Sequence, residues 1–272
     1  MNRSLRFVLA LASGLICAVG TVGASPVGAT GGGLSPAAIA QYKSTHDTDP
    51  HVPLSASDRA LVLQKEQAVA AALGVSQVLA PDTWRNQSGL IGQNQQAQSN
   101  GYYCGPASTS EALGLSSISL SQASAASLEK TTSGGTAWSG VNANVPSQYL
   151  TGYPVRDVLN YKHGTMWYVP VNLPYAPSGT DITNYETNVG MDVDAHWAVV
   201  GDAWEVVNGP HLTGHPNLEI FHYFTIIGYT SYATYTSYED SATSVWGSVP
   251  AYTFGFSTST LVTILGGRGY IW

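Results

Sequence analysis

The order in which helical and strand patterns occur is the feature that most constrains the fold of this chain. Helix-compatible segments come first, at residues 105–114, 121–130 and 146–150. From residue 165 onward the chain is rich in Val, Ile, Thr, Tyr, Phe and Trp, which favour strands. Strands are expected at residues 165–171, 196–200, 222–229, 232–238, 251–256 and 261–265. Helices followed by strands predict an α+β fold with segregated layers.

The N-terminus has the pattern of an export signal. Arg3 and Arg6 precede an apolar run over residues 7–22, and small residues suitable for cleavage end at Ala24, with a second such site at Ala29. The run is short for a membrane span of about 20 residues. We therefore expect a removable signal peptide at residues 1–24 and a secreted, extracellular protein without a stable membrane anchor.

The charge of the chain argues against several classes of protein. Lys, Arg, Asp and Glu make up 10% of the residues, and the net charge is −7. Nothing in this balance attracts phosphate backbones, so no nucleic-acid partner is expected. Because average soluble proteins contain about 25% charged residues, the low fraction also argues against a coiled coil or a charge-rich disordered chain.

Two segments separate the signal from the main domain. Residues 25–55 carry glycines and prolines without a clear period, which indicates a linker. Ser55 can cap a helix that runs to Leu73 and ends at Gly74. We assign residues 25–88 to a linker and N-terminal helical extension, which could be a propeptide, and residues 89–272 to the main domain.

Removal of the signal leaves a single thiol. Cys17 lies in the signal, so Cys104 remains alone. A lone cysteine in an exported protein indicates intermolecular pairing or a reactive thiol, whereas the alternative is a buried small hydrophobe. Cys104 stands at the start of an expected helix, with Pro106 at a tolerated first-turn position. Free N–H groups and positive potential there favour a thiolate, so Cys104 is a candidate nucleophile.

The same N–H groups can receive a developing oxyanion, and a glutamine shortly upstream can add a side-chain donor. Gln95, Gln96 and Gln98 all lie shortly upstream and compete for this role.

A histidine and a carboxylate supply the other half of a nucleophilic site. His222 begins an expected strand, and a hairpin would return Asp240 to the histidine end. The carboxylate could then hold the imidazole tautomer, which completes a Cys-His-Asp system. Two alternatives remain open. His196 also begins an apolar strand, and Glu239 would replace Asp240 if the register slips by one residue.

The remaining histidines are expected to be surface or loop residues. His211 and His215 have a spacing that could ligate a metal on a helix. Gly214 and the flanking prolines argue against a helix there. His163 is likewise expected to be a surface or loop residue, and we expect no metal and no cofactor.

Taken together, roughly residues 90–242 resemble the C39-like branch of the papain-like cysteine peptidases. The resemblance rests on these motifs: Gln98, Cys104-Gly105-Pro106-Ala107, Ser121-Gln122, Gly134-Gly135-Thr136, His222, Ile227-Gly228-Tyr229 and Asp240-Ser241-Ala242. One departure is Phe221, where several such sequences have glycine directly before the catalytic histidine.

The resemblance implies a papain-like fold, in which the nucleophile stands on a helix packed against an antiparallel sheet that carries the base. It also implies Cys104 as nucleophile, His222 as base, Asp240 as the residue that orients the base, and Gln98 as oxyanion donor.

We therefore expect a monomeric, secreted cysteine peptidase that acts on a peptide or protein, with cell-wall peptide among the options. Groove loops, including residues 170–188, would set its specificity. An amidase or acyltransferase could use the same residues. The rival class is a non-catalytic peptide- or cell-wall-binding module, since seven Trp and 16 Tyr could line a groove. A third hypothesis is an exported structural or interaction protein in which the cysteine is simply buried.

Overall fold

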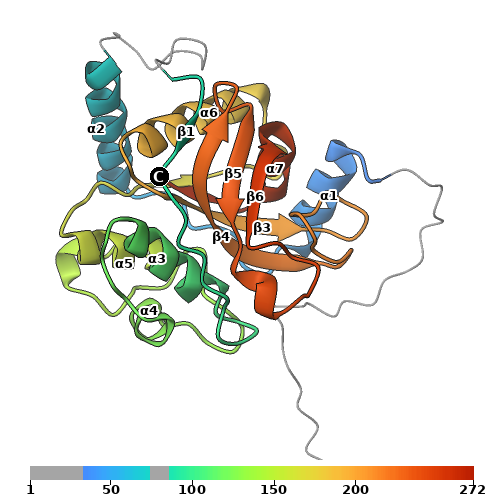
Figure 1. The fold of residues 1–272 in the computed structure, drawn as a ribbon, viewed down its shortest axis with the longest axis horizontal. Helices are drawn as coiled ribbons and strands as arrows, with labels where there is room; N and C mark the ends of the chain where they lie inside the picture. Colours follow the sequence, from blue (N-terminus) through green and yellow to red (C-terminus); the bar gives the residue numbers. More distant parts are fainter. Residues whose placement is uncertain (1–32, 74–85) are drawn as a thin grey trace, which may run out of the picture.

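An antiparallel sheet forms the centre of the computed structural model, which describes residues 33–73 and 86–272. Within these residues the sheet has seven strands in the order β2-β7-β3-β4-β5-β6, and β1 also pairs with β4 (Figure 1). All strand pairs are antiparallel. The strands are β1 (Gly89–Leu90), β2 (Pro170–Asn172), β3 (Val199–Glu205), β4 (Ile220–Thr230), β5 (Tyr235–Glu239), β6 (Tyr252–Ser257) and β7 (Gly269–Ile271).

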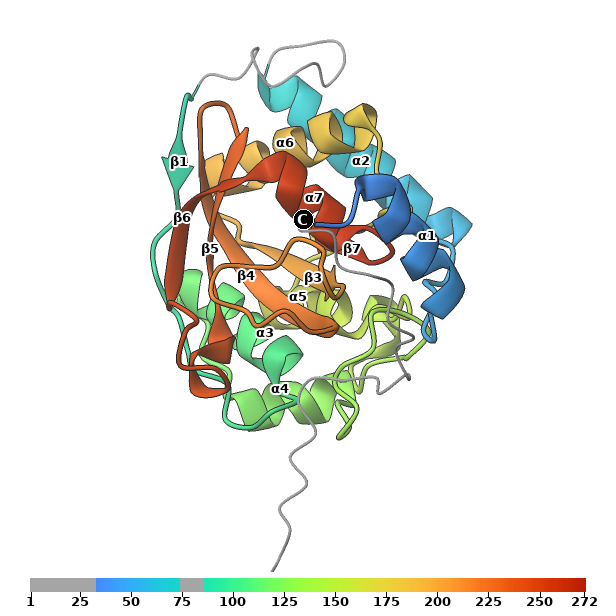
Figure 2. The ribbon, with the colours of Figure 1, turned by 90° about the vertical axis from the view of Figure 1, so that its right-hand side faces the viewer.

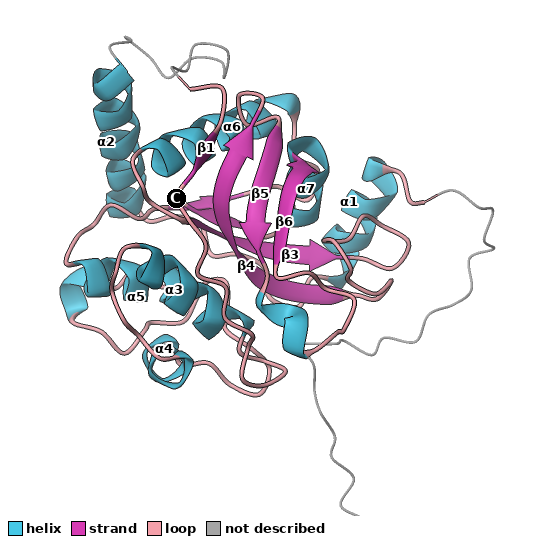
Figure 3. Ribbon diagram, viewed as in Figure 1, coloured by secondary structure: helices cyan, strands magenta, loops and turns pink. Residues whose placement is uncertain are grey.

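Helices cover both faces of this sheet. The helices are α1 (Pro36–His46), α2 (Ala56–Leu73), α3 (Cys104–Leu115), α4 (Gln122–Glu129), α5 (Pro154–His163), α6 (Gly179–Asp194) and α7 (Thr258–Leu265), with short 3-10 helices η2 (Ser147–Tyr149) and η3 (Ser241–Ser244). Figures 2 and 3 show α3, α4 and α5 together on one side and α6 and α7 on the other. Along β4, Tyr223 packs in the cluster of α3 and α5, whereas Phe224 packs in the cluster of α6 and α7. The predicted α+β class and the helix expected at residues 55–73 are confirmed.

The layer of α6 and α7 corrects two predictions. Residues 261–265, expected as a strand, lie in α7, where Leu261 and Leu265 share one buried helix face. Burial of this apolar face outweighs the β-propensity of the segment. Much of the expected loop 170–188 is α6, which begins with a capping box between Ser178 and Asp181. That Ser-x-x-Asp spacing is a helix signal readable from the sequence.

The N-terminal extension packs onto the sheet domain through a buried lysine. Residues 36–46, expected within the linker, form α1, and Lys43 of α1 is fully buried. Its Nζ donates hydrogen bonds to the carbonyls of Thr263, Ile264 and Gly266 at 3.1, 2.9 and 2.7 Å, where α7 ends. A cation is favourable at a helix C-terminus, although burial lowers the pKa of Lys43 to about 7.

The expected signal peptide lies outside the described residues. None of the helices in the described part of the chain combines the length and the apolar character needed to cross a membrane.

Buried carboxyl groups join α3 to the sheet. Glu111 of α3 accepts hydrogen bonds from the Gln96 N–H and the Thr225 hydroxyl at 2.9 and 2.7 Å, and Glu239 of β5 accepts one from the Asn94 N–H at 2.8 Å. Burial raises the pKa of Glu111 to about 8, with a further contribution from the charge of Glu239, and burial raises the pKa of Glu239 to about 7. The pair is therefore largely protonated in mildly acidic solution.

The Glu111→Gln variant is expected to unfold at a higher temperature than the parent protein at pH 8, with little difference at pH 5. In the unfolded chain, Glu111 ionises near the ordinary glutamate pKa of 4.5. Between that value and about 8 the unfolded state binds fewer protons than the folded state, so the stability falls as the pH rises. Glutamine removes the part of this pH dependence that Glu111 contributes. Thermal unfolding across this pH range is the measurement, and parallel curves for the two proteins would contradict the prediction.

Candidate active site

Cys104 is the first residue of α3, and the neighbouring residues explain its position. The side chain is 3% exposed, and Pro106 occupies the first turn as predicted. Gly105 lies against the loop 134–136, and a Cβ atom there would lie 2.6 Å from Thr136 Oγ1. Only glycine therefore permits this loop to approach the start of the helix. The first N–H groups of α3 have no partner within the helix, which suits a thiolate and an oxyanion.

Cys104 lines a cavity of about 360 Å³. Its other walls come from the loop 132–138, from the sheet and from Arg268. Phe221 belongs to this wall, and its ring centroid lies 5.1 Å from that of Trp204. The phenylalanine that departs from the family pattern thus shapes the cavity beside Cys104. Thr48 and Asp49 of the N-terminal extension also line the cavity.

His222 and Asp240 form a buried pair, as the hairpin prediction requires. Thr225 pairs with Glu239 across β4 and β5, so the next residue, Asp240, returns to the histidine end of β4. The His222 Nε2 lies 2.9 Å from Asp240 Oδ1, which also accepts a hydrogen bond from the Ala242 N–H at 2.8 Å. Burial alone would raise the pKa of Asp240, but the charge of His222 and the hydrogen bonds of His215 and His222 hold this pKa well below its usual range.

The elements that carry Cys104, His222 and Asp240 are in contact. Helix α3 packs against β4 and against η3, and Asp240 is the N-cap of η3. Tyr223 of β4 shares a hydrophobic cluster with Cys104, so β4 passes beside the start of α3. The pKa of Tyr223 is raised by burial and by the nearby charges of Asp202, Glu129 and Cys104.

The structure separates the two alternatives for the base and the carboxylate. His196 is exposed and follows α6 with a φ of 62°. Val199 pairs with Ile226 whereas Ala203 pairs with His222, so His196 lies beyond the opposite end of β3 from His222. The structure therefore does not bring His196 to the pair. Glu239 belongs to the buried pair with Glu111.

Gln98 is fixed beside the segment that follows Asp240. Its backbone N–H donates to the Ser241 carbonyl at 2.8 Å, and its side-chain oxygen accepts a hydrogen bond from the Ser241 hydroxyl at 3.3 Å. Its amide nitrogen donates to the Asn100 carbonyl at 2.7 Å. The competing Gln95 uses its amide nitrogen to hold the Asp240 carbonyl at 2.8 Å, which is a structural role.

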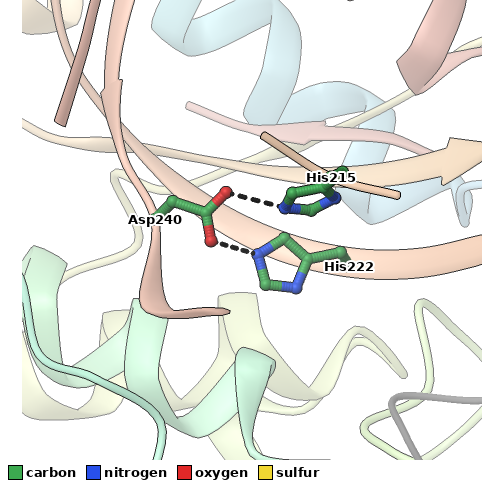
Figure 4. A group of neighbouring side chains, drawn as sticks. All are labelled: His215, His222 and Asp240. Atoms are coloured by element: carbon green, nitrogen blue, oxygen red, sulfur yellow. Dashed lines mark hydrogen bonds and ion pairs between the residues drawn. The ribbon is translucent and has the colours of Figure 1, made fainter. Parts of the chain in front are cut away.

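His215 lies in a loop, within the expectation of a surface or loop residue, but its side chain is buried. Its Nε2 lies 3.0 Å from Asp240 Oδ2, and its Nδ1 lies 2.8 Å from Glu205 Oε1 (Figure 4 shows His215, His222 and Asp240). The His211 Nδ1 lies 2.5 Å from the other oxygen of Glu205. As expected, residues 210–216 form no helix. The spacing of His211 and His215 was visible in the sequence, but their shared contact with Glu205 was not, because Glu205 lies on β3 and the chain returns to it.

In the described parts of the chain, His215, His222 and Asp240 could hold a metal ion, since their ligand atoms lie within 4.8 Å of one another. Both Nε2 atoms already face the oxygens of Asp240. A metal would displace both hydrogen bonds, so the arrangement fits a proton-holding network better than a metal centre. The absence of a metal stays a prediction.

Comparison with known proteins adds one family match. A family model described as "Peptidase_C39 like family" matches residues 90–257. Among solved structures, the crystal structure of xylellain, a cysteine protease from Xylella fastidiosa, is similar at 12% identity and a TM-score of 0.40, covering 82% of this chain and 90% of that chain. None of the curated proteins compared with the chain matches it.

Proposed function

The chain belongs to the Peptidase_C39-like family, and on that premise we propose that it is a secreted cysteine peptidase that hydrolyses peptide bonds. The observation that carries this proposal is the position of Cys104 at the start of α3, on a cavity and on a helix that packs against the elements of the buried His222–Asp240 pair. Secretion is proposed from the N-terminal signal pattern.

In the proposed reaction, His222 accepts the thiol proton of Cys104, and the thiolate sulfur attacks the carbonyl carbon of the scissile amide. The oxyanion of the tetrahedral intermediate accepts hydrogen bonds from the Cys104 N–H and from the side chain of Gln98. An amide nitrogen carries two hydrogens, so Gln98 can keep its bond to Asn100 while it donates to the oxyanion.

Collapse of the intermediate breaks the carbon–nitrogen bond, and the His222 imidazolium gives its proton to the leaving amine. Water then attacks the thioester, with His222 as the base, and releases the acid and the free thiol. Asp240 holds the imidazole tautomer and stabilises the imidazolium throughout.

The reactivity of Cys104 tests this proposal without a known substrate. We expect iodoacetamide to alkylate Cys104 of the folded protein at about pH 6 faster than it alkylates the urea-unfolded protein, whose thiol ionises near 8.5. The His222→Ala variant should react at least about tenfold more slowly. The His196→Ala variant is the matched control and should react like the parent protein.

A fluorogenic peptide library then measures turnover. Cleavage of the library supports a peptidase. If Cys104 is inert in the folded protein and the library stays intact, the protein is a non-catalytic member of the family, and binding of uncleaved peptides becomes the function to test.

A further inference from the structure

Asp240 is held on both carboxylate oxygens by histidines from different segments. The Nε2 atom of His222, on β4, lies 2.9 Å from Asp240 Oδ1. The Nε2 atom of His215, in the connection between β3 and β4, lies 3.0 Å from Asp240 Oδ2 (Figure 4). The proposed peptidase reaction uses only the first of these contacts. The second contact involves a buried, titratable side chain, so it needs its own explanation.

The connection between β3 and β4 that carries His215 packs closely against the segment around Ser248. Gly214 has a φ of 80°, and a Cβ atom there would lie 2.1 Å from the Ser248 carbonyl oxygen. The Ser248 hydroxyl also donates to the Gly214 carbonyl at 2.6 Å. Only glycine fits this close approach, and it turns the following residue, His215, toward the sheet. The indole ring of Trp246, 4.9 Å from the His215 ring, covers it with an uncharged surface.

The surroundings of His215 favour a charged imidazole. Its Nε2 faces an oxygen of Asp240 and its Nδ1 faces an oxygen of Glu205, at 3.0 and 2.8 Å. A neutral imidazole carries one N–H, so its other nitrogen would point a lone pair at a carboxylate. Both contacts are favourable only in the imidazolium. The contact of His215 with Glu205 is a close ion pair rather than a well-aligned hydrogen bond. A positive charge on the ring attracts the Glu205 carboxylate even without good hydrogen-bond alignment.

The charged groups around His215 agree with this state. Asp240 and Glu205 contact it directly, and the ring centroid of His222 lies 5.1 Å away. Burial lowers the pKa of His215, but the hydrogen bonds and charges of Asp240 and Glu205 outweigh burial and raise this pKa above its ordinary value. Glu205 in turn contacts His211 and lies within the electrostatic reach of Lys43 of α1.

We propose that His215 is a positioning residue of the active site, held as a cation between Glu205 and Asp240, that fixes the second oxygen of Asp240 and sets the proton affinity of His222. This inference rests on the proposed peptidase function. With both oxygens held, the carboxylate of Asp240 cannot rotate away from His222. The positive charge of His215 offsets part of the attraction of Asp240 for a proton on His222. His222 can therefore release its proton to a leaving group more readily than it could beside an unshared carboxylate.

Two variants remove the cation in different ways. His215→Gln removes the imidazole. Glu205→Gln lets a neutral His215 accept a hydrogen bond from the new amide at Nδ1 while its Nε2–H still donates to Asp240. In both variants His222 should hold its proton more tightly. The matched control is His211→Gln, because His211 contacts Glu205 but not Asp240.

The test measures the rate of Cys104 alkylation by iodoacetamide against pH, with thermal unfolding to show that each variant is folded. For His215→Gln we expect the step that reports loss of the His222 proton to move up by about one pH unit, a tenfold change in proton affinity. Glu205→Gln should move it in the same direction, and His211→Gln should superimpose on the parent protein. If His215→Gln does not fold, Glu205→Gln carries the test.

Nuclear magnetic resonance of the imidazole groups provides an independent readout. In the parent protein, the His215 ring should give the shifts of an imidazolium at pH 7. A neutral His215 at this pH, or unshifted alkylation profiles in the folded variants, would overturn the role of His215 alone. If Cys104 of the parent protein does not react at all, the peptidase proposal fails, and the positioning role fails with it.

Discussion

Replacing Cys104 with alanine is expected to abolish peptide hydrolysis, with a loss of more than about 10⁴-fold in kcat/KM, while the protein stays folded. The thiol is the proposed nucleophile, and no thioester forms without it. The side chain is small and lines a cavity, so its truncation should cost little stability. Turnover of the best peptide from the library is the measurement, with thermal unfolding alongside.

Ser108 provides the matched control for this variant. It lies about one turn farther along α3 and is fully buried, and its hydroxyl makes no hydrogen bond within the described residues. Ser108→Ala should retain the turnover of the parent protein. Turnover that survives in Cys104→Ala would place the nucleophile elsewhere and overturn the proposed mechanism.

Asp240→Asn is expected to lower kcat by about 10² to 10⁴-fold. An amide has only one oxygen, so it cannot accept hydrogen bonds from both His215 and His222 as the two carboxylate oxygens do. Asp240 accepts hydrogen bonds from His222 and the Ala242 N–H on one oxygen and faces His215 on the other. The asparagine amide presents N–H groups to one side, so at least one histidine must change its tautomer or move. Measurement of kcat for the best library peptide tests this expectation.

Glu239→Gln is the control, because Glu239 is the neighbouring carboxylate that a one-residue shift in register would have placed at the site. It should retain turnover. A Glu239→Gln variant as inactive as Asp240→Asn would mean that the buried carboxyl pair, and not contact with His222, explains the loss.

The Asp240→Asn variant should also show a specific pH dependence of stability. The folded-state pKa of Asp240 is held below the unfolded value of 3.8. Ionised Asp240 therefore stabilises the folded protein at pH values above 3.8. This contribution to the free energy of unfolding is lost as the pH falls below 3.8 toward the lower folded-state pKa. We expect the variant to unfold at a lower temperature than the parent protein near pH 7, and the difference to shrink toward about pH 3.

The signals found in the sequence were local. The sequence indicates Cys104 as a candidate nucleophile because Gly105 and Pro106, which mark a helix start, follow it directly. The contact of Asp240 with His222 could be predicted because a hairpin connects neighbouring strands, and alternation along a strand indicates which end its partner reaches. Residues 261–265 were misassigned because a short run of Leu, Val, Thr and Ile fits a strand as well as a buried helix.

His196 and His222 show where local evidence ends. Each begins an apolar segment with a carboxylate downstream, and only the register of β3 against β4 places them at opposite ends of the sheet. The burial of His215 could not be predicted from its local sequence either. The sequence marked it as a loop residue, and its burial depends on Glu205, Asp240 and the turn at Ser248, which other segments supply.

From the sequence alone, the family and the α+β class could be predicted, and Cys104, His222, Asp240 and Gln98 could be proposed as site residues, because each proposal depends on neighbours or on a single hairpin. The tertiary structure alone decided that α6 and α7 cover the second face of the sheet, that Lys43 joins the extension to α7, and that His215 shares Asp240 with His222. These features depend on burial and charge contributed by distant segments, and the pattern along one segment carries no information about which distant groups will surround it.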